Sequence, residues 1–356
     1  MRLLSFLTVL FLPAAVLAAQ TERYTLDGDD VAIYNLAGQL QVEAGQGTVA
    51  VQMTRGGAEA ARLKVVQDEV SGRRSLRVIY PGDRVYFAGD DGRSSTEIRV
   101  RDDGTFGDGD EWEHHRGWHD SRDARKVIIG SRPGGVDAHA DLRVQVPPGH
   151  RVSLYLAVGK VTVANVSGEL LVDAASAPVT VTGFKGTLGI DVGSGMVRAT
   201  QVDGDLSIDT GSGSVEISRV NGKTLSVDTG SGDVTGSDLQ GGELSIDTGS
   251  GEIRLSVVRS PKISLETGSG AITADLREDV GSLDVETGSG DIAITAPPTL
   301  GAEVEIETSS GDIETDFPLQ VTRHGRDHMT GRIGDGRGSI AIETGSGEIK
   351  LLKRSS

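Results

Sequence analysis

The chain contains no cysteine. Disulfide bonds, thiolate metal sites and cysteine nucleophiles are therefore excluded, and the fold must be held by its core and its backbone hydrogen bonds. Aromatic residues make up only 4% of the 356 residues, whereas glycine occurs 50 times. This composition is poor for a compact globular core and favours a structure in which tight corners recur every few residues.

Basic residues are also few, since 35 of them stand against 52 acidic residues, which gives a formal net charge of -17. A charge of this sign repels nucleic acid and anionic membrane surfaces, and it favours solubility or the binding of cations. We therefore expect no nucleic-acid partner.

Long apolar runs are absent except for one at the start of the sequence. Residues 3–12 are mostly apolar, Arg2 precedes them, and small residues follow up to Ala18 and Ala19. This arrangement predicts a secretory signal peptide over residues 1–19. Because the run is too short to cross a bilayer, we expect no integral membrane segment after its removal. The expected location is the periplasm, the cell surface or the extracellular medium.

What the sequence has in abundance is one ten-residue repeat. Apolar and polar residues alternate up to an acidic residue, and Thr-Gly-Ser-Gly and another apolar position follow. The copies occupy residues 188–197, 206–215, 225–234, 244–253, 263–272, 283–292, 304–313 and 340–349, and a degenerate copy occupies 170–179. Successive copies start 18 to 21 residues apart, except for a final step of 36 residues.

Each copy predicts two short strands joined by a glycine-rich corner, because alternation is the signature of a half-buried strand. Such a unit cannot bury its apolar face alone. Coils stacked about 4.8 Å apart would pair every backbone group and form one continuous core. The predicted fold is therefore all-β, a β-solenoid with coils of 18–21 residues. The alternative is a sandwich of hairpins, although a sandwich would not require the same corner residues in every copy.

The repeat also predicts the domain organisation. Residues 20–141 form an N-terminal β-rich region, with a first coil near residues 36–49 and a polar loop over 102–125. Residues 142–356 form the solenoid. An insertion at 317–338 is expected to lengthen one coil, and to cover an exposed edge, before the last repeat closes the stack.

The repeated unit Leu-Ser-Ile-Asp-Thr-Gly-Ser-Gly, the lead-in at 146–149 and the variant unit at 309–313 resemble a bacterial β-strand-repeat family of candidate adhesins. That family is a domain of unknown function. The resemblance covers residues 36–351 and implies a repetitive β fold with a binding role. It implies no catalytic motif and transfers no site residue.

The acidic position of the repeat is the first candidate site. Asp191, Asp209, Asp228, Asp247, Glu266 and Glu286 would lie about 4.8 Å apart along the stack. The non-functional interpretation is a solvated acidic face, which also keeps the sheet from pairing with other chains. The functional interpretation is weak calcium binding along a ladder that includes Asp209, Asp228 and Asp247. Asp-Thr-Gly-Ser also resembles the motif of an aspartic protease. We reject that function, because its chemistry needs two carboxylates brought face to face.

The polar loop is the second candidate site. His114, His115, His119 and Asp120 are weak candidates for a zinc, copper or nickel site, although their spacing matches no tight metal motif. A hydrated loop is the alternative. Trp112 and Trp118, the only tryptophans of the chain, could instead contact a sugar or a protein partner.

No catalytic motif stands out from these regular units, so we expect no enzyme and no cofactor other than weakly bound calcium. The predicted function is that of an exported binding or scaffolding protein of the cell envelope, with an unidentified protein or glycan as its partner. Two alternatives stay open. One is a periplasmic accessory of envelope-stress signalling. The other is a carbohydrate-active enzyme, for which the only irregular cluster in the repeat region is Arg323, His324, Arg326 and His328.

Overall fold

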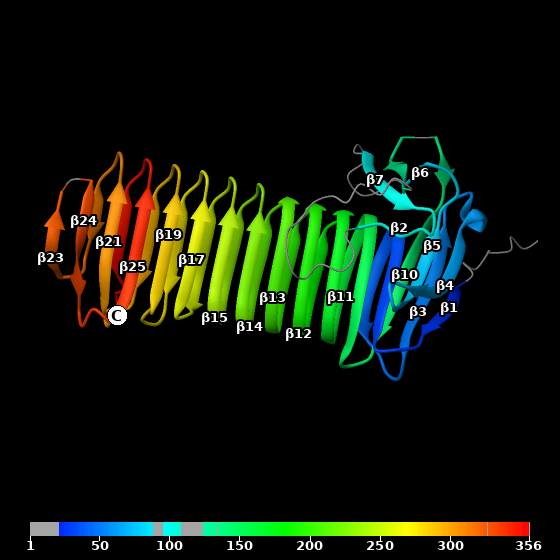
Figure 1. Ribbon diagram of the computed structural model, residues 1–356, viewed down its shortest axis with the longest axis horizontal. Coiled ribbons are helices and arrows are strands. Elements are labelled where there is room, and N and C mark those ends of the chain that lie inside the picture. The colour runs from blue at the N-terminus through cyan, green and yellow to red at the C-terminus, as the bar shows by residue number, and fades with distance from the viewer. Residues whose placement is uncertain (1–20, 88–94, 108–123, 133, 326, 356) are drawn as a thin grey trace, which may run out of the picture.

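The computed structural model describes residues 21–87, 95–107, 124–132, 134–325 and 327–355. These residues form an almost entirely β structure, with a single turn of 3-10 helix, η1 (Ala60–Arg62). Figure 1 shows one long rod of stacked strands, with a less regular N-terminal part at one end and a hairpin at the other. Neither the predicted signal peptide nor most of the predicted polar loop lies within the described residues.

The middle of the rod consists of long strands that each run around a corner of the solenoid. They are β11 (His150–Ser176), β12 (Val179–Ser194), β13 (Val197–Ser212), β14 (Val215–Thr229) and β15 (Val234–Thr248). Consecutive strands pair in parallel, so that Leu188 lies beside Leu206 and Leu206 beside Leu225. Parallel pairing of equivalent residues confirms the β-solenoid and shows that the hairpin sandwich was wrong.

Beyond β15 the coils are built from shorter strands. They are β16 (Ile253–Arg259), β17 (Lys262–Thr267), β18 (Ile272–Leu276), β19 (Ser282–Thr287) and β20 (Ile292–Ala296). The parallel register continues through them, as in the pairing of β15 with β17 and of β17 with β19.

The core runs along the inside of the rod and receives side chains from three directions in each coil. In one coil Leu206 and Ile208 come from the first strand segment, Val215 and Ile217 from the second, and Val220 from the third. None of these side chains is more than 2% exposed. The alternation seen in the sequence therefore places one residue inside and the next outside, as the strand period requires.

The glycine corners are required by space as well as by conformation. Gly213 has a φ of 145°, and a Cβ atom on it would lie 2.1 Å from the carbonyl oxygen of Gly195 in the preceding coil. The amide of Gly213 donates to the carbonyl of Ser231 in the following coil at 3.0 Å. Stacked corners thus approach too closely for any side chain at this position.

The N-terminal end begins with β2 (Asp30–Ala44), which pairs in parallel with the first half of β11 and forms the first coil. Further strands cover this coil. The second half of β2 pairs with β10 (His139–Val146), which is followed by β3 (Val49–Gly56) and β1 (Thr21–Leu26). The first half of β2 pairs with β5 (Arg73–Ile79), which is followed by β4 (Lys64–Val70). A separate small sheet contains β6 (Arg84–Tyr86), β7 (Ser95–Arg101), β8 (Ala124–Gly130) and β9 (Val136–Asp137).

The C-terminal end differs from the expected order of coils. The last repeat forms β25 (Gly338–Thr344) and β26 (Ile349–Lys353), but it does not close the stack. β25 lies between β19 and β21 (Ala302–Thr308), and β26 lies between β20 and β22 (Ile313–Thr315). Figure 1 shows the red β25 inside the orange end of the rod. The last repeat in the sequence is thus the penultimate coil in space.

The segment predicted as an insertion forms the cap of this end. β23 (Leu319–His324) and β24 (His328–Ile333) pair as an antiparallel hairpin, and β24 also pairs with β21. The hairpin covers the edge of β21, as expected of an edge-protecting element, but it follows the outermost coil and does not lengthen an inner one. No helix among the described residues has the length and apolar composition needed to cross a membrane.

Candidate functional site

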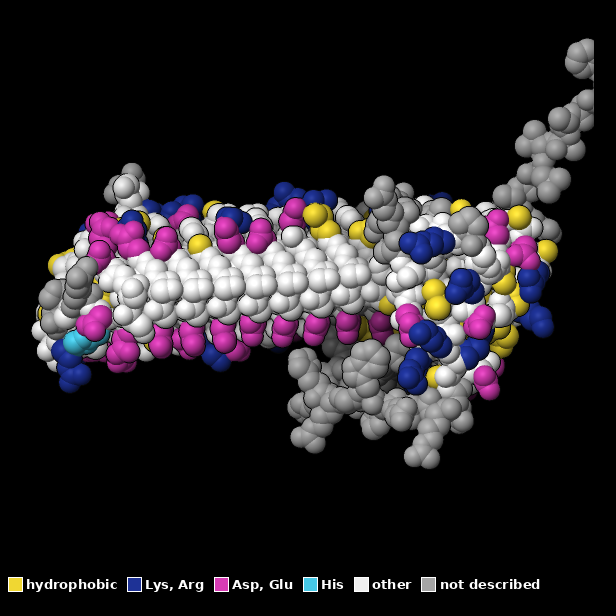
Figure 2. Space-filling model, turned by 90° about the horizontal axis from the view of Figure 1, so that it is seen from above, with side chains coloured by type: hydrophobic (Ala, Val, Ile, Leu, Met, Phe, Trp, Pro, Cys, Tyr) yellow, Lys and Arg dark blue, Asp and Glu magenta, His cyan; other side chains and the backbone are white. Residues whose placement is uncertain are grey.

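The acidic positions of the repeats line up in one row along the outside of the rod. Each carboxylate lies beside the equivalent residue of the next coil, in the order Asp173, Asp191, Asp209, Asp228, Asp247, Glu266, Glu286, Glu343 and Glu307. We call this row the carboxylate ladder. Figure 2 shows a regular row of acidic side chains beside a pale ridge. Because neighbouring strands lie about 4.8 Å apart, the ladder is about 40 Å long.

The carboxylates of the ladder repel one another. The pKa of Asp247 is raised, first by partial burial and then by the charge of Asp228. The pKa of Glu266 is raised mainly by the charge of Asp247, and less by partial burial and by Glu286 and Asp284. A positively charged partner placed along the ladder would relieve this repulsion.

The ladder is a row of pairs and not a metal cage. Asp209, Asp228 and Asp247 come from three successive coils, so a cation between two of them would meet the side chains of two strands only. Among the residues that the structure describes, no group of three or more His, Asp or Glu side chains is arranged to hold a metal ion. Calcium usually takes six to eight oxygen ligands, so binding here would leave much of its shell to water.

The histidine-rich candidate cannot be placed. His114, His115, His119 and Asp120 lie outside the described residues, as do Trp112 and Trp118. The metal site and the docking role predicted for this loop therefore stay predictions.

A polar pocket lies where the ladder reaches the C-terminal hairpin. It has a volume of about 390 Å³, and it is lined by Glu307, Thr308, Ser309, Arg323, Asp327, His328, Glu343 and Thr344. The amide of Thr308 donates to the carbonyl of Asp327 at 2.8 Å, which joins the hairpin turn to β21. The last two carboxylates of the ladder thus share a pocket with a histidine and an arginine.

His328 is the irregular member of this pocket. It lies opposite Glu307 in the antiparallel pair of β24 with β21, and its Nδ1 is 3.7 Å from Oδ1 of Asp327. Its Nε2 is buried and has no hydrogen-bond partner. Of the cluster singled out in the sequence, Arg323 and His328 therefore meet at one pocket. The side chain of His324 and all of Arg326 lie outside what the structure describes.

Comparison with known proteins identifies the repeat region. A family model described as Toastrack DUF4097 matches residues 142–352. The chain belongs to the Toastrack family. This match confirms the expected resemblance to a β-strand-repeat family of unknown function, and it begins in β10, next to the first coil.

The other comparisons add little to the Toastrack assignment. A crystal structure of a candidate cell adhesion protein from Clostridium sporogenes ATCC 15579 aligns over 94% of this chain and 99% of its own, with 10% sequence identity. Its TM-score is 0.18, which is too low to support an argument from shape. No curated protein matches the sequence.

The threonine of the Toastrack repeat has a structural role that the sequence analysis missed. Thr248 is fully buried, and its Oγ1 donates to the carbonyl of Gly232 in the preceding coil at 3.2 Å. The same bond is made by four other threonines, Thr267, Thr287, Thr308 and Thr344. In these five copies the acidic residue faces solvent and the threonine ties one corner to the next, whereas the hydroxyls of Thr210 and Thr229 are buried without a partner.

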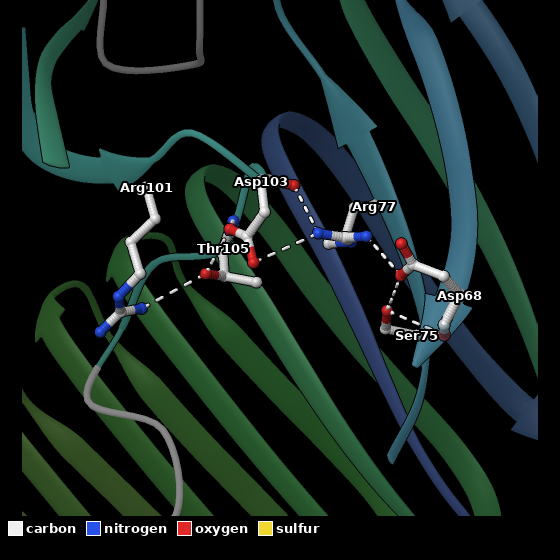
Figure 3. Close-up of polar contacts among 6 residues, drawn as sticks. All are labelled: Asp68, Ser75, Arg77, Arg101, Asp103 and Thr105. Carbon is white, nitrogen blue, oxygen red and sulfur yellow. Dashed lines mark hydrogen bonds and ion pairs between the residues drawn. The ribbon is translucent and has the colours of Figure 1, made fainter. Parts of the chain in front are cut away.

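A buried arginine holds segments of the N-terminal part together (Figure 3). Arg77 of β5 is buried, forms an ion pair with Asp68, and donates to the carbonyl of Asp103 at 2.7 Å. Burial alone would raise the pKa of Asp103, but hydrogen bonds from Thr105 and the charges of Arg77 and Arg101 lower it. The network fixes the segment that follows β7 against β5.

That segment ends on an aromatic cluster at the first coil. Phe106 packs edge-on against Tyr34 and Tyr155, whose rings are stacked with centroids 4.3 Å apart. A Cβ atom on Gly107 would lie 2.4 Å from Oδ2 of Asp173, the first carboxylate of the ladder. Gly107 therefore lies beside the N-terminal end of the ladder.

Proposed function

We propose that this protein is an exported, non-catalytic binding or scaffolding protein of the bacterial cell envelope. The observation that carries the proposal is the carboxylate ladder, one unbroken row of in-register acidic residues on a rigid stack. A repetitive surface of one charge suits an extended partner of the opposite charge, such as a basic segment of an envelope protein. The signal-peptide pattern of residues 1–19 supports export.

The regularity of the ladder argues against catalysis. General acid and base groups need environments that push their pKa values apart, whereas the carboxylates of the ladder occupy equivalent positions in successive coils. The polar pocket at Glu307 and Glu343 is irregular, and we assign specific recognition to it. Its histidine and arginine distinguish it from the other coils that the structure describes.

A binding experiment with a matched control tests the role of the ladder. The variant Asp228→Asn/Asp247→Asn/Glu266→Gln removes three adjacent charges of the ladder. The control Asp203→Asn/Glu216→Gln/Glu243→Gln makes the same change in charge, but at carboxylates paired with Lys185, Arg198 and Lys262. With a lysine oligomer as the probe, we expect salt-sensitive binding that the ladder variant loses and the control retains. Equal losses in both variants would show that only net charge matters.

Protease treatment of intact source cells, with fractionation of periplasm and medium, tests the location. Digestion of the protein on intact cells would support an adhesive role at the surface. Protection until the envelope is opened would move the function to the periplasm, where an accessory role in stress signalling is the alternative. Recovery only from the cytoplasm would contradict the proposal.

A further inference from the structure

The last repeat of the chain occupies a slot between two coils that precede it in the sequence. β25 pairs in parallel with β19 on one side and with β21 on the other. β26 is held in the same way between β20 and β22. The segment 338–353 therefore supplies both of these strands, and they lie between two coils that are formed by earlier residues.

The two strands of the inserted segment and their corner are packed and bonded as in an ordinary coil. Ile340, Ile342, Ile349 and Leu351 are at most 1% exposed. Its corner is bonded on both sides, because the amide of Gly290 donates to Ser346 at 2.8 Å and the amide of Gly347 donates to Ser310 at 3.0 Å. The hydroxyl of Thr344 donates to Gly290 at 3.0 Å. Removing the segment would open a gap one coil wide.

The chain could close this gap without the segment. The repeats of β19 and β21 start 21 residues apart, at Leu283 and Val304, whereas the directly stacked repeats of β17 and β19 start 20 residues apart, at Ile263 and Leu283. Both carry the same inward pattern, which ends in a buried threonine, Thr287 in one and Thr308 in the other. The slot is thus held open by its occupant and not by the length of the connection.

One short exposed turn connects the occupant to the rest of the chain. Residues 334–337 follow the capping hairpin, and both of their glycines, Gly334 and Gly336, have positive φ values of 56° and 70°. Straightening this turn would carry the segment away from its own slot and leave its internal pattern intact. A hinge of this kind is the usual requirement for the exchange of an identical element between protomers.

We propose that the slot between β19 and β21 is a strand acceptor, and that segment 338–353 of a second copy of this chain fills it as well as the chain's own segment does. Every contact inside the two stacks is the same in the exchanged pair, and only the turn at 334–337 differs. The proportion of exchanged pairs therefore rises with protein concentration. Exchange would join two rods at their capped ends.

The absence of native cysteine allows a direct test. Asp284 and Ala341 are exposed neighbours across the β19–β25 pair, so Asp284→Cys on one chain can form a disulfide with Ala341→Cys on another only when the donor segment is exchanged. Two full-length chains with different tags, each with one of these substitutions, are unfolded and refolded together over a range of concentrations and then oxidised. We expect a disulfide-linked heterodimer whose yield increases with concentration.

The matched control uses Ser226→Cys and Ser245→Cys, which occupy the same column on β14 and β15 within the uninterrupted stack. The heterodimer from this pair measures random collision. A yield from the Asp284 and Ala341 pair no higher than that of the control would overturn the proposal. Because refolding itself can fail, the two chains are also produced together in one host, and the same comparison applies to the folded product.

A chain with both substitutions, Asp284→Cys/Ala341→Cys, provides a second measurement. Oxidised when folded and dilute, it should form the disulfide within one chain and stay monomeric when it is concentrated. Failure to form that internal disulfide would show that β25 does not lie beside β19. The proposal would then be wrong, because it depends on this pairing. Neither result depends on the ladder having a partner, so the exchange and the proposed function are tested separately.

Discussion

Glu266 lies directly beside Asp247 on the neighbouring strand of the stack, and the charge of Asp247 is the main cause of the raised pKa of Glu266. A carboxyl group with a raised pKa binds its proton more tightly in the folded state than in the unfolded state. The free energy of unfolding therefore decreases as the pH rises from the usual carboxyl value of 4.5 through the higher folded value. At neutral pH the charge of Glu266 therefore opposes folding.

Removing one charge of the ladder should accordingly stabilise the protein. We expect Glu266→Gln to raise the free energy of unfolding at neutral pH and low salt by less than about 1 kcal/mol, because the side chain is exposed and screened. Urea unfolding measures the gain, which should shrink in high salt and below the folded pKa. Glu216→Gln is the control, since Glu216 is paired with Arg198 and should give no gain. A gain that salt leaves unchanged would exclude repulsion as its cause.

The buried threonines should differ in a predictable way. Thr267 donates to the carbonyl of Gly251, whereas the hydroxyl of Thr229 is buried without a partner. We expect Thr267→Val to cost about 1 kcal/mol in the free energy of unfolding, because it leaves a buried carbonyl with one bond fewer. Thr229→Val should be neutral or stabilising. Equal losses in thermal or urea unfolding would mean that the hydroxyl bond between coils contributes nothing.

The corner glycines should be intolerant of any side chain. A Cβ atom on Gly251 would lie 2.1 Å from the carbonyl oxygen of Gly232, and its φ is 155°. We expect Gly251→Ala to cost more than about 3 kcal/mol, since the clash is with backbone that cannot move alone. Gly47→Ala is the comparison: Gly47 also has a positive φ, 77°, but no atom within 4 Å of its added Cβ. That change should cost only about 1 kcal/mol, so similar losses would contradict a role for close stacking.

Calcium provides a further test of the ladder. If pairs of carboxylates on successive coils bind calcium, millimolar calcium should raise the melting temperature, and Asp228→Asn/Asp247→Asn should abolish the shift. Asp203→Asn/Glu216→Gln should leave it unchanged, because both of these carboxylates are paired with basic residues. A melting temperature that calcium does not change would exclude calcium binding by the ladder. Basic groups would then be its expected ligands.

The solenoid itself could be predicted from the sequence. The spacing of the repeats gives the coil length, their apolar positions give the inward residues, and their glycines give the corners. The column from Asp191 to Glu286 was likewise predictable, since the position of each acid in its repeat fixes its place on the strand. The inward threonines also left a signal. They stand where the alternation places an apolar residue, and a polar residue at such a position needs a hydrogen-bond partner.

The order of the last coils could not be predicted, for a physical reason. Leu283, Val304 and Ile340 begin units with the same pattern, so any one of them can stack beside any other at similar energy. Only tertiary contacts decide among these arrangements. The pocket was missed for the same reason, because Glu343 joins Glu307 and His328 only in the observed order.

This order of coils has a consequence for how the protein is made. A solenoid whose coils follow the chain can grow one coil at a time as the polypeptide emerges, each new turn templated by the one before it. Here β21 and its hairpin emerge before the strand that must lie beneath them. Since β21 could first stack directly on β19, the distal end reaches its observed order only after residues 338–353 have arrived and taken their place between these two strands.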